Sequence, residues 1–157
     1  MTALRFIFIL TLMTSLTVCA RRAETCWICQ REVHDSVRTT LTLASGRSIV
    51  ACCPRCALHY QEEPGNRVRE TRVTDYSGGG LLPFAAAYLV EGSDETPCLR
   101  HHPVDGEGRT PMQVCYDRCM PSLIAFKDEK AARVFAADHG GTVYSPGRFP
   151  NPAPAAP

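Results

Sequence analysis

The stretch IVACCPRCALHY, residues 49–60, places three cysteines within five positions, directly after an apolar run. Residues 48–52 have the composition of a strand, and Pro54 opens a segment that is typical of a short helix. Upstream, VRTTLTL (37–43) alternates like a second strand, and ASGR between the two strands is a turn. A strand pair that ends in cysteines at the start of a helix predicts a small α+β unit with thiols at its corner.

The same order of elements recurs along the chain. NRVRETRVTDY (66–76) closes the first unit as a strand, and AAAYLVEG, TPMQVCYD and its apolar continuation SLIAF read as strands of a second unit. KDEKAARVFAADHGG is a helix whose apolar positions Ala131, Val134, Phe135 and Ala136 share a face and which ends at Gly140, and TVYS returns as a strand. We predict an α+β fold of two small related ββαβ, treble-clef-like halves. Units of this size need a staple of metal or disulfides, because their cores alone are marginal.

The chain therefore divides into four parts. Residues 1–19 are a signal peptide, 20–76 the cysteine-rich half, 77–144 the second half, and 145–157 a proline-rich tail expected to be disordered. SGGGLLP, at the start of the second half, is interpreted as a hinge.

The amino-terminal segment predicts export. It carries Arg5 and then an apolar run from Phe6 to Val18, which is too short to span a bilayer comfortably. LTVC resembles a lipobox, in which Cys19 becomes the lipidated first residue; ordinary cleavage after Ala20 is the alternative. A lipid anchor would tether the protein to a bacterial cell-envelope membrane, facing the periplasm or the exterior.

Composition excludes several classes of function. Charges balance to a net +1, with no basic patch, so nucleic acid is not an expected partner. The sequence shows no nucleophile motif, carboxylate dyad or phosphate-binding loop, and we do not expect an enzyme. Nine cysteines in 157 residues are the unusual quantity.

The first-half cysteines favour a metal site. Cys26 and Cys29 are spaced as C-x2-C, as are Cys53 and Cys56, and two such pairs are typical of tetrahedral thiolate sites for zinc or copper(I). Cys52 is the alternative to Cys53 as a metal ligand. Structural disulfides and a thiol redox use of CWIC are the alternatives.

The second half offers a possible second site. Its candidate ligands are Cys98, His101, Cys115 and Cys119, with His102 beside them, although Cys115 and Cys119 also suit a disulfide. His139 ends a helix, where an imidazolium suits the dipole, and is interpreted as structural. Trp27, inside CWIC, is expected to shield the thiolates from solvent.

Two resemblances to known families rest on these residues. CWICQREV and VACCPRCALHY resemble the metal-binding TRASH and YHS motifs, which implies Cys29, Cys52 and Cys56 as ligands. AAYLVEGS and SLIAFKDEKAARVFAADHGGTVYS resemble the NosL family of lipoproteins, which are implicated in delivering copper to nitrous oxide reductase. That resemblance implies an exported, membrane-tethered copper(I)-binding protein.

The chain departs from the NosL pattern at two places. Cys29 is followed by Gln30 and Arg31, where the family has glycine and methionine, and the family's metal-associated methionine falls at Cys119 or Met120. A thiolate in place of a thioether makes zinc a competitor of copper. We therefore expect a soft-metal carrier or metallochaperone for copper(I) or zinc, which passes its ion to an envelope protein. The alternatives are a structural-zinc interaction module and a thiol-disulfide oxidoreductase.

Overall fold

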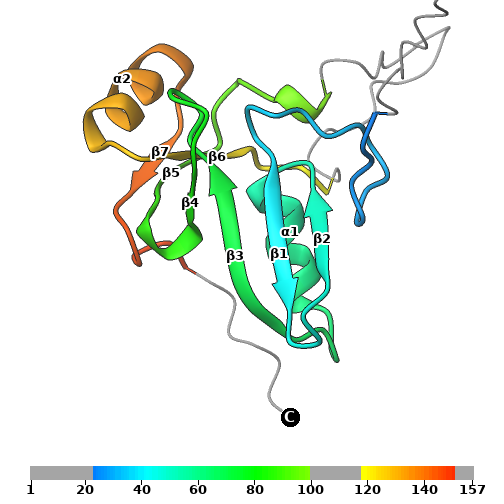
Figure 1. The fold of residues 1–157 in the computed structure, drawn as a ribbon. Coiled ribbons are helices and arrows are strands. Elements are labelled where there is room, and N and C mark those ends of the chain that lie inside the picture. Colours follow the sequence, from blue (N-terminus) through cyan, green and yellow to red (C-terminus); the bar gives the residue numbers. More distant parts are fainter. Residues whose placement is uncertain (1–22, 100–117, 151–157) are drawn as a thin grey trace, which may run out of the picture.

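Residues 23–99 and 118–150 are described by a computed structural model of the chain. Within these ranges the backbone forms two small antiparallel sheets and two α-helices (Figure 1). No helix in these ranges has the length and apolar character needed to cross a bilayer. The predicted signal peptide, the Cys19 anchor, His101, His102 and Cys115 lie outside the described residues, as does the strand expected at 110–117.

The first sheet has the strand order β2-β1-β3-β4. Its members are β1 (Thr39–Leu43), β2 (Ser48–Ala51), β3 (Val68–Thr74) and β4 (Leu81–Pro83), and α1 (Pro54–Glu62) connects β2 to β3. Pro54 occupies the first turn of α1, where its missing N–H has no partner to lose. The segment interpreted as a hinge instead forms a tight turn and β4, which pairs with β3.

The second sheet has the order β6-β5-β7. It contains β5 (Tyr88–Glu91), β6 (Leu123–Phe126) and β7 (Thr142–Tyr144), with α2 (Glu129–His139) between β6 and β7 and two short 3-10 helices, η1 (Phe84–Ala86) and η2 (Pro97–Leu99). In each half the first strand lies between the second and third, with the helix inserted before the third. The α+β class is confirmed.

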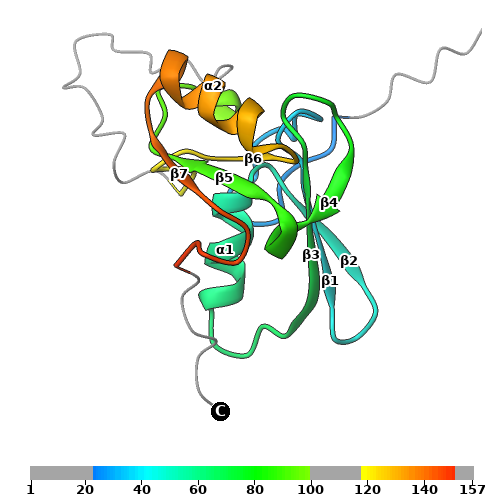
Figure 2. The ribbon, with the colours of Figure 1, turned by 90° about the vertical axis from the view of Figure 1, so that its left-hand side faces the viewer.

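Helix α1 lies between the two sheets. Ala57 packs into the core of the first sheet, whereas Leu58 packs against Leu89 and Leu123 of the second. Neighbouring residues of a strand point to opposite faces, and the other face of the second sheet packs against Phe135 of α2 (Figure 2). The first half is therefore joined to the second through α1.

Two sequence expectations differ from the structure at the edges of the second half. On α2, Phe135 is buried, and Ala131 and Ala136 pack against the same core as predicted, but Val134 is 55% exposed and the buried Ala132 was not among the predicted positions. Residues 145–150 do not continue a disordered tail, because Phe149 packs against Phe84 and Tyr144. Gly140, at φ 72, ends α2 as predicted.

Candidate metal centre

The segment CWIC forms a tight turn that cradles one sulfur. The backbone N–H groups of Ile28 and Cys29 point at Cys26 Sγ at 3.4 and 3.5 Å, and Cys26 N–H donates to the carbonyl of Arg31 at 2.7 Å. Trp27 N–H donates to the carbonyl of Val50 at 2.9 Å, which fastens the turn to β2. Backbone donors aimed at a sulfur stabilise its thiolate form, which is the form that binds metal.

Gln30, directly after this turn, adopts φ 61, in the left-handed region. This is the position at which the NosL family has glycine, the residue that adopts such a φ without steric cost. Here the Gln30 side chain donates to the carbonyl of Trp27 at 3.0 Å. This local hydrogen bond stabilises the left-handed turn that glycine would adopt without cost.

The corner between β2 and α1 supplies three more sulfurs. Cys52 follows the last residue of β2, Cys53 is the N-cap of α1, and Cys56 lies in the first turn. Cys52 Sγ is 3.7 Å from Cys56 Sγ and 3.4 Å from Cys29 Sγ. It is thus Cys52, and not Cys53, whose sulfur gathers with those of Cys26, Cys29 and Cys56. Adjacent residues at a strand end point to opposite sides, which turns Cys53 away from this group.

Cys119, from the second half, completes a near-equilateral triangle. Its Sγ lies 3.6 Å from Cys52 Sγ and 3.7 Å from Cys56 Sγ, and the third edge is the 3.7 Å between Cys52 and Cys56. For four sulfurs held at the zinc–thiolate distance, a tetrahedron has edges of about 3.8 Å. The sulfurs of these three cysteines are therefore spaced like ligands of a soft tetrahedral metal.

The described cysteines form two groups of four that are able to hold a metal. The first is Cys26, Cys29, Cys52 and Cys56; the second is Cys52, Cys53, Cys98 and Cys119; within each group the sulfurs lie within 4.8 Å of one another. Six of these seven side chains are buried, and Cys29 is partly exposed. No disulfide joins two of the seven.

Close contacts between the thiols raise the pKa of some and lower the pKa of others. Contact with Cys119 raises the pKa of Cys52 and Cys56 above the usual range. Contact with Cys29, and then with Cys52, lowers the pKa of Cys119 to about 2. For Cys26, contact with Cys29 raises the pKa, but contacts with Cys52 and Cys56 lower it to a net value of about 6. An incoming metal must displace the protons held by Cys52 and Cys56, so its affinity rises with pH.

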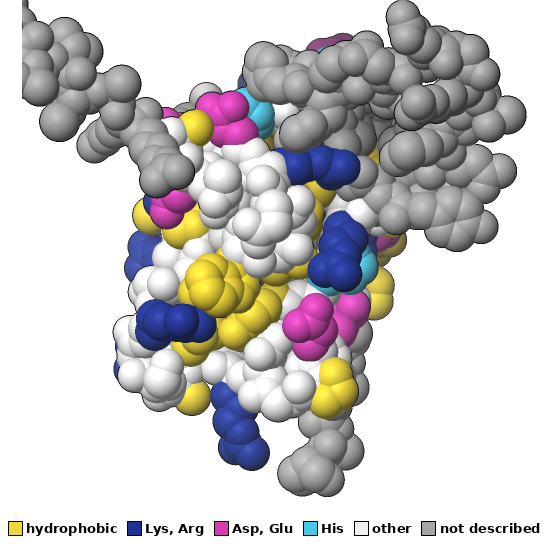
Figure 3. All heavy atoms as spheres, turned by 90° about the vertical axis from the view of Figure 1, so that its right-hand side faces the viewer, with side chains coloured by type: hydrophobic (Ala, Val, Ile, Leu, Met, Phe, Trp, Pro, Cys, Tyr) yellow, Lys and Arg dark blue, Asp and Glu magenta, His cyan; other side chains and the backbone are white. Residues whose placement is uncertain are grey.

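Cations and aromatic side chains surround the cluster unevenly. Arg31 Nη1 lies 3.3 Å from Cys119 Sγ, where its charge offsets that of the thiolates. The Trp27 ring lies at the surface: it is 53% exposed, and the Arg47 guanidinium stacks 4.9 Å from its centroid. On the face toward β2, Figure 3 shows a hydrophobic patch with basic side chains at its edge.

Other predicted residues have structural contacts. His139 lies in the last turn of α2, stacks on Phe135 and contacts Asp94 at 3.0 Å through Nδ1, which fits the structural role predicted for it. The oxidoreductase alternative requires an accessible Cys26. That side chain is fully buried, although its pKa is lowered.

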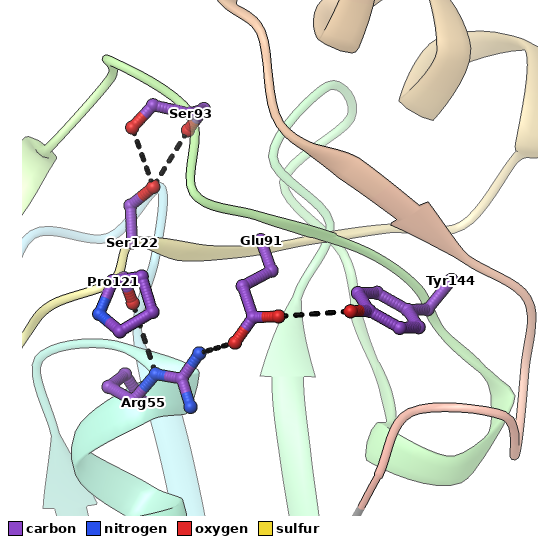
Figure 4. Close-up of polar contacts among 6 residues, drawn as sticks. All are labelled: Arg55, Glu91, Ser93, Pro121, Ser122 and Tyr144. Carbon is purple, nitrogen blue, oxygen red and sulfur yellow. Dashed lines mark hydrogen bonds and ion pairs between the residues drawn. The ribbon is translucent and has the colours of Figure 1, made fainter.

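A polar network joins α1 to β5 and to the segment just before β6 (Figure 4). Arg55, next to Cys56, pairs with Glu91 of β5 and donates through Nε to the carbonyl of Pro121 at 3.0 Å. Tyr144 of β7 donates to the same carboxylate at 3.1 Å. Pro121 follows Cys119 by two residues, so this network holds the turn that presents the second-half sulfur. Sequence periodicity gives no signal for such a long-range pair.

Replacing Glu91 with glutamine is expected to destabilise the fold by about 1–3 kcal/mol, because a mostly buried Arg55 loses its charged partner. The side chains of Arg55 and Glu91 are 13% and 23% exposed. Urea denaturation of the metal-free chain measures the change. Glu70→Gln is the matched control: Glu70 pairs with Arg72 at the surface, where the loss should stay below about 0.5 kcal/mol. Equal losses in the two variants would contradict a special role for the Arg55 network.

Fold and site together define an α+β protein of NosL-like fold with cysteine clusters able to hold a metal. No family model matches the sequence, and no curated protein matches it significantly. Among solved structures, the chain is similar to the copper chaperone NosL from Shewanella denitrificans, with a TM-score of 0.58 and 18% identity. The match covers 78% of this chain and 86% of that one. The NosL resemblance read from the sequence is thus confirmed for the fold.

Proposed function

We propose that the protein binds a soft metal ion, copper(I) in the first place, through Cys26, Cys29, Cys52 and Cys56 and carries it in the bacterial cell envelope. The observation that carries this proposal is the spacing of the sulfurs, which matches a thiolate metal shell. The likeness to a copper chaperone of the same fold supports copper as the cargo. The ion would staple the first of the two treble-clef-like halves, residues 20–76, because all four ligands lie in it.

Cys29 is the exchange point in this proposal. It is the only one of the described cysteines that is partly exposed, and its sulfur contacts Cys52 at 3.4 Å. Contact with Cys119 raises its pKa, but contacts with Cys26, Cys52 and Cys56 lower it to a net value of about 3, which keeps a thiolate ready at the surface. A thiol of the receiving envelope protein can attack the ion here and take over ligands one at a time. Lipidation at Cys19 would tether the carrier beside that partner.

A structural-zinc module is the second candidate, and burial favours it. Cys26, Cys52 and Cys56 are each fully buried, as in closed structural zinc sites that do not release their ion. The two functions differ in how quickly a chelator removes the metal. A buried shell without an exposed ligand would exchange only as fast as the fold opens.

The deciding experiment loads the anaerobically purified chain with copper(I) and follows transfer to a copper(I) chelator. We expect rapid exchange, and a copper(I) affinity lower by on the order of 100-fold in Cys29→Ser, since one thiolate ligand is removed. Trp27→Phe is the matched control, because it alters the same turn without touching a ligand, and should exchange at the wild-type rate. A chain isolated with one zinc that resists chelators, and that takes up no copper(I), would overturn the carrier function.

A further inference from the structure

Three buried thiols are left over when a single ion takes the first group. Cys53, Cys98 and Cys119 are 3%, 5% and 2% exposed, and their sulfurs lie with that of Cys52 within 4.8 Å of one another. They come from separate places: the N-cap of α1, η2, and the turn before β6. Convergence of thiols from three segments on one point is not required by hydrophobic packing, which aliphatic side chains would satisfy.

We propose that the cluster holds two metal ions, which share the sulfur of Cys52 as a bridge. This inference rests on the proposed function and adds a second ion to it. Seven sulfurs supply two complete four-sulfur shells when one of them belongs to both, and Cys52 is the residue common to the two groups. The ligand class is a pair of soft or borderline ions with a tetrahedral preference, zinc or cadmium, and copper(I) where thiolate sharing suits it.

The position of Cys52 suits a bridge. On one side its Sγ contacts Cys29 at 3.4 Å and Cys56 at 3.7 Å; on the other it contacts Cys119 at 3.6 Å and Cys53 at 3.9 Å. These distances lie near the tetrahedral edge of about 3.8 Å in both directions. A thiolate sulfur has lone pairs for more than one metal, and its full burial excludes water from either ion.

A cation lies beside the second shell. A second divalent ion would convert Cys53, Cys98 and Cys119 to thiolates, which adds one net negative charge to the buried cluster. The Arg31 guanidinium, 3.3 Å from Cys119 Sγ, is placed to offset that charge. The two shells also differ in where their ligands come from. Cys98 and Cys119 of the second shell belong to the second half of the chain, whereas every ligand of the first shell belongs to the first half.

The test is a cadmium titration of the full chain, followed by native mass spectrometry and cadmium NMR. We expect two equivalents and two resonances that split each other by scalar coupling through the shared sulfur. In Cys98→Ser one equivalent and one unsplit resonance should remain. Cys115→Ser, at the other predicted second-half ligand, is the matched control and should keep both equivalents. Circular dichroism verifies that each variant folds.

The other outcomes separate the two proposals. One equivalent in the unaltered chain would overturn the second ion and leave the carrier function standing. Two resonances without mutual coupling would overturn the bridge through Cys52. Loss of the second ion in Cys115→Ser but not in Cys98→Ser would overturn the assigned shell. A chain that binds no cadmium would overturn the two-ion cluster and the carrier function together.

Discussion

Substituting serine for Cys52 is expected to abolish tight metal binding at both groups of cysteines. Cys52 is common to both groups, and its sulfur contacts four others. Structural zinc binding of roughly 10–16 kcal/mol, spread over four ligands, is about 3 kcal/mol per ligand, or on the order of 100-fold in affinity. A serine hydroxyl keeps the shape of the side chain but stays protonated and is a hard ligand. Competition with a chromophoric zinc chelator measures the loss.

Cys53→Ser is the matched control for this change, since it alters the neighbouring residue by the same atom. Cys53 belongs only to the second group, so one ion should remain bound at nearly wild-type affinity. If Cys53→Ser lost the first ion while Cys52→Ser kept it, the paired C-x2-C arrangement of the sequence would be the correct ligand set.

Replacing Cys119 with methionine is expected to change metal preference. A neutral thioether is a poor ligand for zinc but a good one for copper(I), so zinc affinity at this shell should fall on the order of 100-fold while copper(I) is still bound. Methionine is larger than cysteine at a site only 2% exposed, and we expect the variant to lose about 1–3 kcal/mol of stability. Parallel competition titrations with zinc and copper(I) give the two affinities.

Met120→Leu distinguishes the two second-half candidates. It removes the adjacent thioether and should leave both affinities unchanged, because Cys119 is the residue whose sulfur reaches Cys52 and Cys56. A loss of copper(I) affinity in Met120→Leu would assign the ligand to Met120 instead.

Local patterns predicted most of the fold. Alternation identified β1, apolar composition identified β2, Pro54 marked the start of α1, and Gly140 marked the end of α2, because each signal depends on neighbours in the chain. On α2 the pattern placed Ala131, Phe135 and Ala136 correctly, but it exchanged Val134 for Ala132, because both lie at the border of the apolar face. The packing of Phe149 in a proline-rich segment carried no local signal at all.

The sequence predicted a thiolate metal site but not which cysteines lie together in it. Spacing indicated a thiolate site, yet it assigned Cys98 and Cys119 to a separate shell with His101 and Cys115. In the structure they converge on Cys52 and Cys53 of the first half. That convergence depends on α1 lying between the two sheets and on the Arg55–Glu91 pair, which are tertiary features.

The triangle of Cys52, Cys56 and Cys119 has a consequence for the lifetime of the protein. Cys52 and Cys119 are 67 residues apart in the sequence, so an ion bound by the second group acts as a reversible cross-link that removes much of the unfolded chain's conformational freedom. Because the ion binds the folded chain in preference to the unfolded one, a loaded copy resists unfolding and proteolysis better than an empty copy. A copy that has lost its ions would be degraded faster than a loaded one, which degradation rates in metal-replete and metal-starved cells would measure.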